Sequence, residues 1–227
     1  MFHALPPELP DDVLAKRKAL PLKMTPVTLE GRFVRVAPLD VERDVEALYR
    51  ISNGEPITIG NRAVEAYDAD EMVWRWMGGG PFADAEAMKP YLQGSVDAPG
   101  LAMCVIDREL EHPVGVATYM NNVPDHLKVE LGSIWYSPLA QRTKANLETT
   151  YLMLQHAFEL GYRRLEWKCN ALNERSRRAA LRMGFTFEGI QDAHYIIKNR
   201  NRDTAWFRML DSEWSTVKAQ LEEMLRA

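Results

Sequence analysis

The chain is poor in cysteine, carries no strong net charge and has no long hydrophobic run. Its 227 residues include two cysteines, Cys104 and Cys169, each inside an apolar run and without the spacing of metal ligands. We therefore expect buried thiols in a reducing compartment and no metal site. A formal net charge of -4 gives no sign of a nucleic-acid partner. No apolar stretch approaches the roughly 20 residues that cross a membrane, so we expect no membrane partner.

The N-terminus also lacks the basic start and apolar centre of a signal peptide, which favours a cytoplasmic protein. Residues 1–30 are rich in proline and predict an extended arm without a core of its own. Residues 31–227 show no internal repeat and no compositional boundary. They predict a single domain that ends in a C-terminal helix.

Hydrophobic periodicity predicts an α/β protein of the α+β type. Apolar runs and two-residue alternation predict strands at 31–37, 101–106, 114–120, 129–136 and 164–170, from Phe185 onward, and at 204–210. Helical spacing predicts helices at 142–160 and in the C-terminal segment, and a short helix around 70–77. Capping residues predict further helices that begin after Asp40, Asp84 and Asn173.

The predicted strand 129–136 runs through Ser137-Pro138 and a loop into the helix 142–160. Proline ends the strand because it cannot donate to the ladder. The first amide groups of the following helix are then free to bind an anion, and Gln141, Arg142 and Lys144 add side-chain donors. A pyrophosphate would suit this position.

Two further motifs are more specific. Asn173-Glu174-Arg175-Ser176 opens a helix that is followed by Gly184-Phe185-Thr186-Phe187-Glu188-Gly189, and Glu130-Leu131-Gly132 lies on the strand 129–136. With these motifs the chain resembles the GNAT superfamily of acetyl-CoA-dependent N-acetyltransferases over roughly residues 31–210. It looks closest to the branch that acetylates N-terminal alanines of ribosomal proteins.

The resemblance implies a mixed, strongly twisted sheet of about seven strands with helices on both faces. The strands 129–136 and 164–170 would splay apart and hold acetyl-CoA in the opening. The residues implied to bind it are the backbone of Ile134, Trp135 and Tyr136 and the side chains of Asn173 and Ser176 near the pantetheine, with Gln141, Arg142, Thr143, Lys144, Ala145 and Asn146 around the pyrophosphate.

The sequence departs from the family pattern in two places. The usual phosphate loop has small residues at the positions of Lys144 and Asn146, where glycine lets the backbone approach phosphate closely. Either Lys144 contacts phosphate with its charge, or the loop binds CoA more weakly. Many members also carry a tyrosine seven residues after the helix-opening asparagine, and here that position is Ala180.

Acetyl transfer to an amine needs a neutral amine, a donor for the oxyanion and a donor for the leaving thiolate. Among the candidate bases, Glu130 matches carboxylates that relatives use, although an ordinary paired strand glutamate is the alternative. His126 and His194 are further candidates because imidazole titrates near neutral pH. Ser176 is a candidate donor to the thiolate, or only a helix cap. We interpret Glu188 as structural.

These observations predict an N-acetyltransferase that moves acetyl from acetyl-CoA to a primary amine, a small molecule or a protein N-terminus, by direct attack in a ternary complex. The alternatives are a catalytically silent CoA-binding sensor or scaffold, and an unrelated α/β ligand-binding domain. Residues 50–80 and 191–203 should form the acceptor pocket, with aromatic side chains at Trp74, Trp76 and Phe82 and acidic ones at Glu55, Glu71 and Asp125 that would attract a cationic amine. The apolar final helix makes a homodimer possible.

Overall fold

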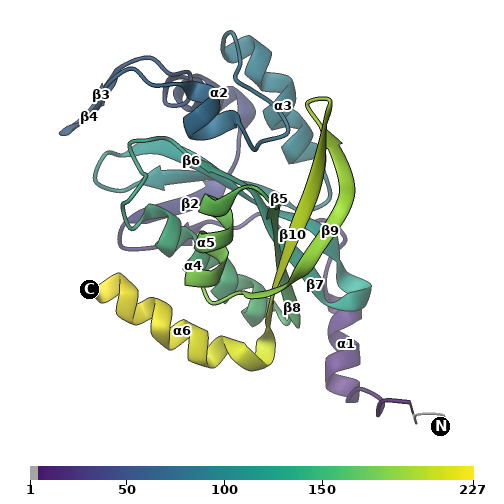
Figure 1. Cartoon of the computed structure of the whole chain (residues 1–227). Coiled ribbons are helices and arrows are strands. Elements are labelled where there is room, and N and C mark those ends of the chain that lie inside the picture. The colour runs from purple at the N-terminus through teal and green to yellow at the C-terminus, as the bar shows by residue number, and fades with distance from the viewer. Residues whose placement is uncertain (1–4) are drawn as a thin grey trace.

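A computed structural model describes residues 5–227, and its centre is an eight-stranded sheet (Figure 1). The strand order is β1-β2-β5-β6-β7-β8-β10-β9, and every neighbouring pair is antiparallel except β7–β8. The strands are β1 (Leu29–Glu30), β2 (Val34–Pro38), β5 (Leu101–Asp107), β6 (His112–Val123), β7 (Lys128–Tyr136), β8 (Arg164–Asn170), β9 (Thr186–Ile197) and β10 (Arg200–Leu210). The mixed sheet of the predicted fold is confirmed.

Helices cover both faces of this sheet, as expected. The helices are α1 (Asp11–Ala19), α2 (Val41–Arg50), α3 (Ala85–Asp97), α4 (Ala145–Leu160), α5 (Glu174–Arg182) and α6 (Asp211–Arg226), with a π-helical turn, η1 (Asp70–Trp74), and a 3-10 turn, η2 (Pro124–His126). In Figure 1, α2 and α3 lie on one side of the sheet and α4, α5 and α6 on the other. A small hairpin of β3 (Ile57–Ile59) and β4 (Arg62–Val64) stands apart from the main sheet.

Local sequence signals placed several of these elements correctly. The side chains of Asp40, Asp84 and Asn173 each accept a hydrogen bond from the backbone three residues on, and so cap α2, α3 and α5. The apolar run 101–106 is a strand in which every residue is buried. α4 connects β7 to β8, which makes this the one parallel pair of the sheet.

The start of the first long strand differs from the prediction. It begins at Val34 because the amide groups of Arg32, Phe33 and Val34 donate to the carboxylate of Glu148 on α4, over 2.6–2.8 Å. Gly31 lies against the same carboxylate, where a Cβ would come within 2.4 Å of Glu148 Oε2. A buried glutamate on a helix therefore replaces strand pairing in this segment.

The N-terminal arm predicted at residues 1–30 is not extended throughout its described part. That segment contains the helix α1 and the short strand β1, which pairs with β2. Leu20 and Met24 are buried in the main core, with 8% and 2% of their surface exposed. A division of the chain at residue 30 stays a prediction.

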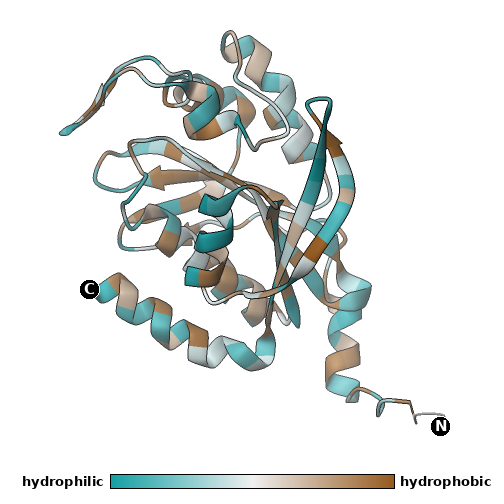
Figure 2. Ribbon diagram, in the orientation of Figure 1, coloured by the Kyte–Doolittle hydropathy of each residue, from teal (hydrophilic) through white to brown (hydrophobic). Residues whose placement is uncertain are grey.

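Two hydrophobic clusters hold the layers together, one on each face of the sheet. The larger packs β7, β8 and β10 against α4, α5 and α6, and the smaller packs β5 and β6 against α2 and α3. Figure 2 shows the hydrophobic colour concentrated in the central strands, whereas the tip of the β9–β10 hairpin is hydrophilic. This hairpin therefore extends from the core toward solvent.

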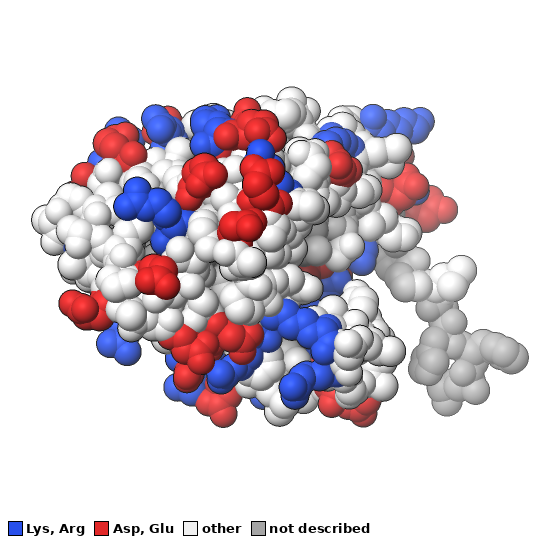
Figure 3. All heavy atoms as spheres, turned by 90° about the horizontal axis from the view of Figure 1, so that it is seen from above, with Lys and Arg blue, Asp and Glu red and all other residues white. Residues whose placement is uncertain are grey.

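Charges are mixed on the surface. Figure 3 shows Lys and Arg interspersed with Asp and Glu over the face seen from above, as the small net charge suggests. Within residues 5–227, no helix is both long enough and apolar enough to cross a membrane.

Candidate active site

The strands β7 and β8 separate halfway along their length. Their parallel register runs from the pair Lys128–Arg164 to the pair Leu131–Trp167 and then ends. Beyond this point β7 stays with β6 and β8 stays with β10. A cavity of about 400 Å³ lies at the opening between them. The expected splay of the two strands is confirmed.

A β-bulge sits on β7 at the same place. Gly132 pairs with Thr118 and Trp135 pairs with Val116, so Ser133 and Ile134 have no register partner on β6 or on β8. Ser133 has a φ of +48°, which turns the strand. Both bulge residues, Ser133 and Ile134, line the cavity.

A side chain at Gly132 would force Met120 and Glu130 to move. A Cβ at Gly132 would come within 2.5 Å of the sulfur of Met120 and 3.0 Å of Glu130 Oε1. The carboxylate of Glu130 thus lies over the backbone of the Glu-Leu-Gly motif, directly before the bulge. This contact gives the motif a physical reason.

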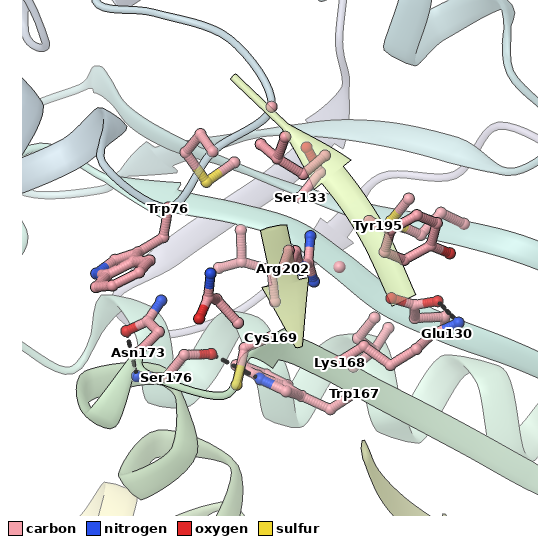
Figure 4. Close-up of a pocket in the computed structure, with 18 of the residues that line it drawn as sticks. Trp76, Glu130, Ser133, Trp167, Lys168, Cys169, Asn173, Ser176, Tyr195 and Arg202 are labelled. Carbon is pink, nitrogen blue, oxygen red and sulfur yellow. Dashed lines mark hydrogen bonds and ion pairs between the residues drawn. The ribbon is translucent and has the colours of Figure 1, made fainter. Parts of the chain in front are cut away.

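Side chains from five parts of the chain line the cavity (Figure 4). They come from the loop after η1, from α3, from the facing ends of β6, β7 and β8, from the start of α5, and from the β9–β10 hairpin. The lining residues are Trp76, Met77, Gly78, Tyr91, Met120, Asn121, Glu130, Leu131, Gly132, Ser133, Ile134, Trp167, Lys168, Cys169, Asn170, Asn173, Ser176, Tyr195, Ile197 and Arg202.

Glu130 lines the cavity but is not an isolated carboxylate. Its Oε2 forms an ion pair with the ammonium of Lys168 and accepts a hydrogen bond from the amide of Asn121, each over 2.6 Å. Its Oε1 has no hydrogen-bond partner within residues 5–227. One oxygen therefore anchors the side chain, and the other is available to a ligand or a water.

Asn173 and Ser176 come together at the α5 end of the cavity. The Asn173 Oδ1 accepts from the Ser176 amide over 3.1 Å, and the Ser176 Oγ accepts from the Trp167 indole over 2.9 Å. Because the Ser176 oxygen already accepts from Trp167, its own hydrogen is free to donate elsewhere. The structure brings both predicted residues to one place, where Asn173 caps α5 and Ser176 presents an oriented hydroxyl.

The loop 141–146 leads into α4 beyond the far end of β7. The amide groups of Asn146 and Leu147, in the first turn of α4, have no acceptor within the described chain. Arg142 is exposed and forms no ion pair within that same range. Lys144 differs, because its ammonium donates to the carbonyl of Met224 near the end of α6. The anion site expected here consists of backbone donors and Arg142, with the Lys144 charge directed to α6.

Trp135 and Tyr136 turn their side chains away from the cavity. Trp135 packs in the smaller core at 4.9 Å from Trp74, and burial raises the pKa of Tyr136 far above its usual range. Only their backbone can reach a ligand, as the resemblance implied. Thr143 and Ala145 likewise contribute local structure, since the Thr143 hydroxyl accepts from the Ala145 amide.

The position where many relatives carry a tyrosine is occupied here by Ala180, which is fully buried in the core. No acid therefore stands at this position. Two other tyrosines reach the cavity, Tyr91 from α3 and Tyr195 from β9. Burial raises the pKa of Tyr91, against a hydrogen bond with Ser133 that lowers it. Tyr91 is therefore held protonated beside the bulge.

The two histidine candidates lie in different surroundings. His126 is exposed in η2 and does not line the cavity. His194 stacks near Trp206, and partial burial lowers its pKa, together with the positive charges of Lys168 and Arg202. Glu188 forms an ion pair with Arg164, which agrees with a structural role.

Parts of the two segments predicted to form the acceptor pocket line the cavity, and other residues predicted for it lie elsewhere. Segments 76–78 and 195–202 do line the cavity, and Trp76 is among them. Trp74 and Phe82 instead pack together in the core, with ring centroids 5.0 Å apart. The acidic residues expected to attract a cation, Glu55, Glu71 and Asp125, are exposed and lie outside the lining.

Sequence reasoning missed Lys168 and Tyr91, and it included Arg202 only as part of the segment 191–203. The alternation of residues 164–170 does place Lys168 on the same face as Glu166, but nothing local shows that this face meets Glu130. Arg202 belongs to a polar turn in the sequence, whereas the structure pairs it with Tyr195 across the hairpin. Only the register of three strands brings these residues to one cavity.

Comparison with known proteins agrees with this geometry. The model of the family described as "Acetyltransferase (GNAT) domain" matches residues 55–186, more than half of the chain. No curated protein gave a significant match.

Several solved structures are similar over most of their length. A GCN5-related N-acetyltransferase from Brucella melitensis is 36% identical, with a TM-score of 0.80, over 88% of this chain and 86% of its own. A probable GNAT-family acetyltransferase from Chromobacterium violaceum is 34% identical, with a TM-score of 0.74, over 85% and 90%. A ribosomal-protein-S5-alanine acetyltransferase from Vibrio fischeri is 17% identical, with a TM-score of 0.61, over 83% and 98%, and shares the fold.

Proposed function

Because the chain belongs to the GNAT acetyltransferase family, we propose that it transfers the acetyl group of acetyl-CoA to a primary amine by direct attack in a ternary complex. The single observation that supports this most is the cavity at the β7–β8 separation. The cavity is lined by the β7 bulge, whose residues have no register partner, by the Glu130 carboxylate with one free oxygen, and by the oriented Ser176 hydroxyl. These are the groups that acyl transfer to an amine requires.

The residues present fit acetyl-CoA. The free edge of β7 beyond Leu131 offers backbone groups to the amide-containing pantetheine, and the first turn of α4 with Arg142 offers donors to the pyrophosphate. Lys144 and Asn146 add side chains where relatives have small residues. The Lys144 side chain is held at α6, so it does not fill the space in front of the α4 amides.

The chain's own groups can then be assigned roles. A bulge amide at Ser133 or Ile134 donates to the carbonyl oxygen on which negative charge develops. Glu130 accepts the proton of the amine through Oε1, directly or through one water. Ser176, fixed by the Trp167 indole, donates to the leaving thiolate.

A catalytically silent CoA-binding sensor remains the second candidate. It is favoured by the absence of a tyrosine at Ala180 and by the filled positions in the phosphate loop. The two candidates differ in turnover, because a sensor binds acetyl-CoA and releases no free thiol. Cytoplasmic location, the absence of a nucleic-acid or membrane partner, and a homodimer stay predictions.

Calorimetric titration with acetyl-CoA tests the proposal first. We expect one-to-one binding in the micromolar range, followed by thiol release when an amine panel is added. Binding without release for any amine would favour the sensor. No binding up to millimolar acetyl-CoA would refute both candidates.

A further inference from the structure

Arg202 is a cation without a counter-ion in the cavity. Within residues 5–227, no carboxylate lies within 4.0 Å of its guanidinium, and its Nε is buried without an acceptor. Two other arginines of β8 and β10 are fully paired, Arg164 with Glu166 and Glu188, and Arg208 with Glu213. Arg200 of β10 is also without an ion pair within residues 5–227, but it is exposed, whereas the Nε of Arg202 is buried.

The position of Arg202 is fixed by its neighbours. Its guanidinium lies over the ring of Tyr195, 5.4 Å from the centroid. It projects into the cavity in Figure 4, and the Oδ1 of the adjacent Asp203 accepts from the Ala193 amide and from Asn201. A buried guanidinium donor without an acceptor is costly in a folded protein, so its partner is expected in a ligand.

A carboxylate is the group that matches this donor best, because it accepts two parallel hydrogen bonds from a guanidinium. We propose that the acceptor amine carries a carboxylate, as a free amino acid does, and that Arg202 binds this carboxylate. This inference rests on the acetyltransferase function proposed above and names the class of its acceptor.

The remaining charges of the cavity support an anionic acceptor. Lys168 and Glu130 pair with each other, so Arg202 leaves the cavity with one net positive charge. That charge attracts a carboxylate and repels an ammonium, which favours the neutral amine needed for attack. The charges of Lys168, Arg202 and Glu130 all act on His194, which shows that they are grouped closely.

The cavity also has apolar walls. Trp76, Met77, Tyr195 and Ile197 line it, and Lys198 at the hairpin tip donates to the carbonyl of Trp74 over 2.8 Å. The hairpin is thereby tied to the end of η1. A small amino acid with an apolar side chain fits this enclosure.

The test compares matched acceptors and matched variants. The twenty protein amino acids, their primary amides, a polyamine and a short peptide are offered with saturating acetyl-CoA, and free thiol is measured. The variants are Arg202→Met, Arg202→Lys and the control Arg200→Met, which changes an exposed arginine two residues away on the same strand. Acetyl-CoA affinity is measured for each by calorimetry, and thermal unfolding checks that each is folded.

We expect at least one free amino acid to be a substrate and its amide to be roughly 10- to 100-fold poorer in kcat/KM. In Arg202→Met, kcat/KM should fall by the same factor for the free amino acid and little for its amide. The affinity for acetyl-CoA should be unchanged. Arg202→Lys should recover part of the loss, and Arg200→Met should match the unaltered chain.

Three results would overturn the inference. They are equal or better turnover of amides, peptides or polyamines, a loss of acetyl-CoA affinity in Arg202→Met, and acetyl-CoA binding without turnover of any free amino acid. Failure of acetyl-CoA to bind would instead refute the proposed function. A thermal-shift titration with the amino acids alone then still tests Arg202, because stabilisation of the unaltered chain but not of Arg202→Met measures the contact without acetyl-CoA.

Discussion

Lys168 on β8 and Glu130 on β7 form a 2.6 Å ion pair at the cavity, with only 9% and 6% of their side-chain surfaces exposed. The Lys168 ammonium also lies over the Trp206 ring, 4.1 Å from its centroid. The pair joins the two strands directly before they separate. It fixes one oxygen of Glu130 and leaves the other free.

Replacing Glu130 by glutamine should lower turnover by about 100-fold or more, because an amide cannot take the proton of the amine. Acetyl-CoA affinity should stay the same, since the assigned contacts to acetyl-CoA come from other residues. Thiol release with the best amine of the panel and calorimetry measure the two effects. Normal turnover of Glu130→Gln would show that Glu130 is not the base.

Lys168→Met should reduce the free energy of unfolding by about 3–5 kcal/mol, because it leaves the buried Glu130 carboxylate without its counter-charge. The double variant Glu130→Gln/Lys168→Met removes both charges and should cost less than the sum of the two single changes. Urea unfolding of the three variants measures this coupling. Strict additivity would mean that the pair contributes nothing to stability.

Asn173→Ala should lower stability by about 1 kcal/mol through loss of the α5 cap, and should weaken acetyl-CoA binding. Asn173→Asp keeps the capping oxygen but loses the amide donor. We therefore expect Asn173→Asp to restore stability and to remain weak in binding. Full affinity in Asn173→Asp would contradict a direct contact of the amide with acetyl-CoA.

Ser176→Ala should leave the Trp167 indole without its acceptor and reduce stability by about 1–3 kcal/mol. If the hydroxyl donates to the thiolate, kcat should also fall roughly tenfold, and Ser176→Thr, which keeps a hydroxyl, should recover most of it. Steady-state kinetics of both variants separate the effects. An unchanged kcat in Ser176→Ala would leave Ser176 with only its structural contact to Trp167.

The pKa of His194 is lowered by partial burial and by the positive charges of Lys168 and Arg202. Arg202→Met removes one of these charges, so the pKa should rise, and the imidazole should stay protonated to a higher pH than in the unaltered chain. NMR titration of the His194 ring protons measures the midpoint. An unchanged midpoint would place Arg202 farther from His194 than the structure does.

Arg142→Met should weaken acetyl-CoA binding more than Lys144→Met does. Arg142 is exposed and unpaired within the described residues, whereas the Lys144 ammonium is bound to the Met224 carbonyl. The contribution of Arg142 to acetyl-CoA affinity should also decrease more with salt than that of Lys144, because salt screens an exposed charge. Calorimetry at two salt concentrations compares the variants, and a larger loss in Lys144→Met would reverse the assignment.

Local patterns predicted most of the elements around the site. The cap at Asn173 and the glycine at 184, with a φ of +87°, define α5 because capping and chain reversal depend on neighbouring residues alone. The buried run 101–106 identified a central strand for the same reason. The N-terminal segment was misjudged because α1 has almost no apolar periodicity and no buried residue.

The sequence by itself identified the family, by resemblance, and the positions of the main elements, because these follow from short motifs and local spacing. The meeting of Glu130, Asn173 and Ser176 near one opening was implied by that resemblance alone. Only the tertiary structure decided that Glu130 pairs with Lys168, that Lys144 turns to α6 and that the Nε of Arg202 finds no acceptor among residues 5–227. Ion pairs between strands depend on register and sheet order, which bring together residues that no spacing along the chain relates.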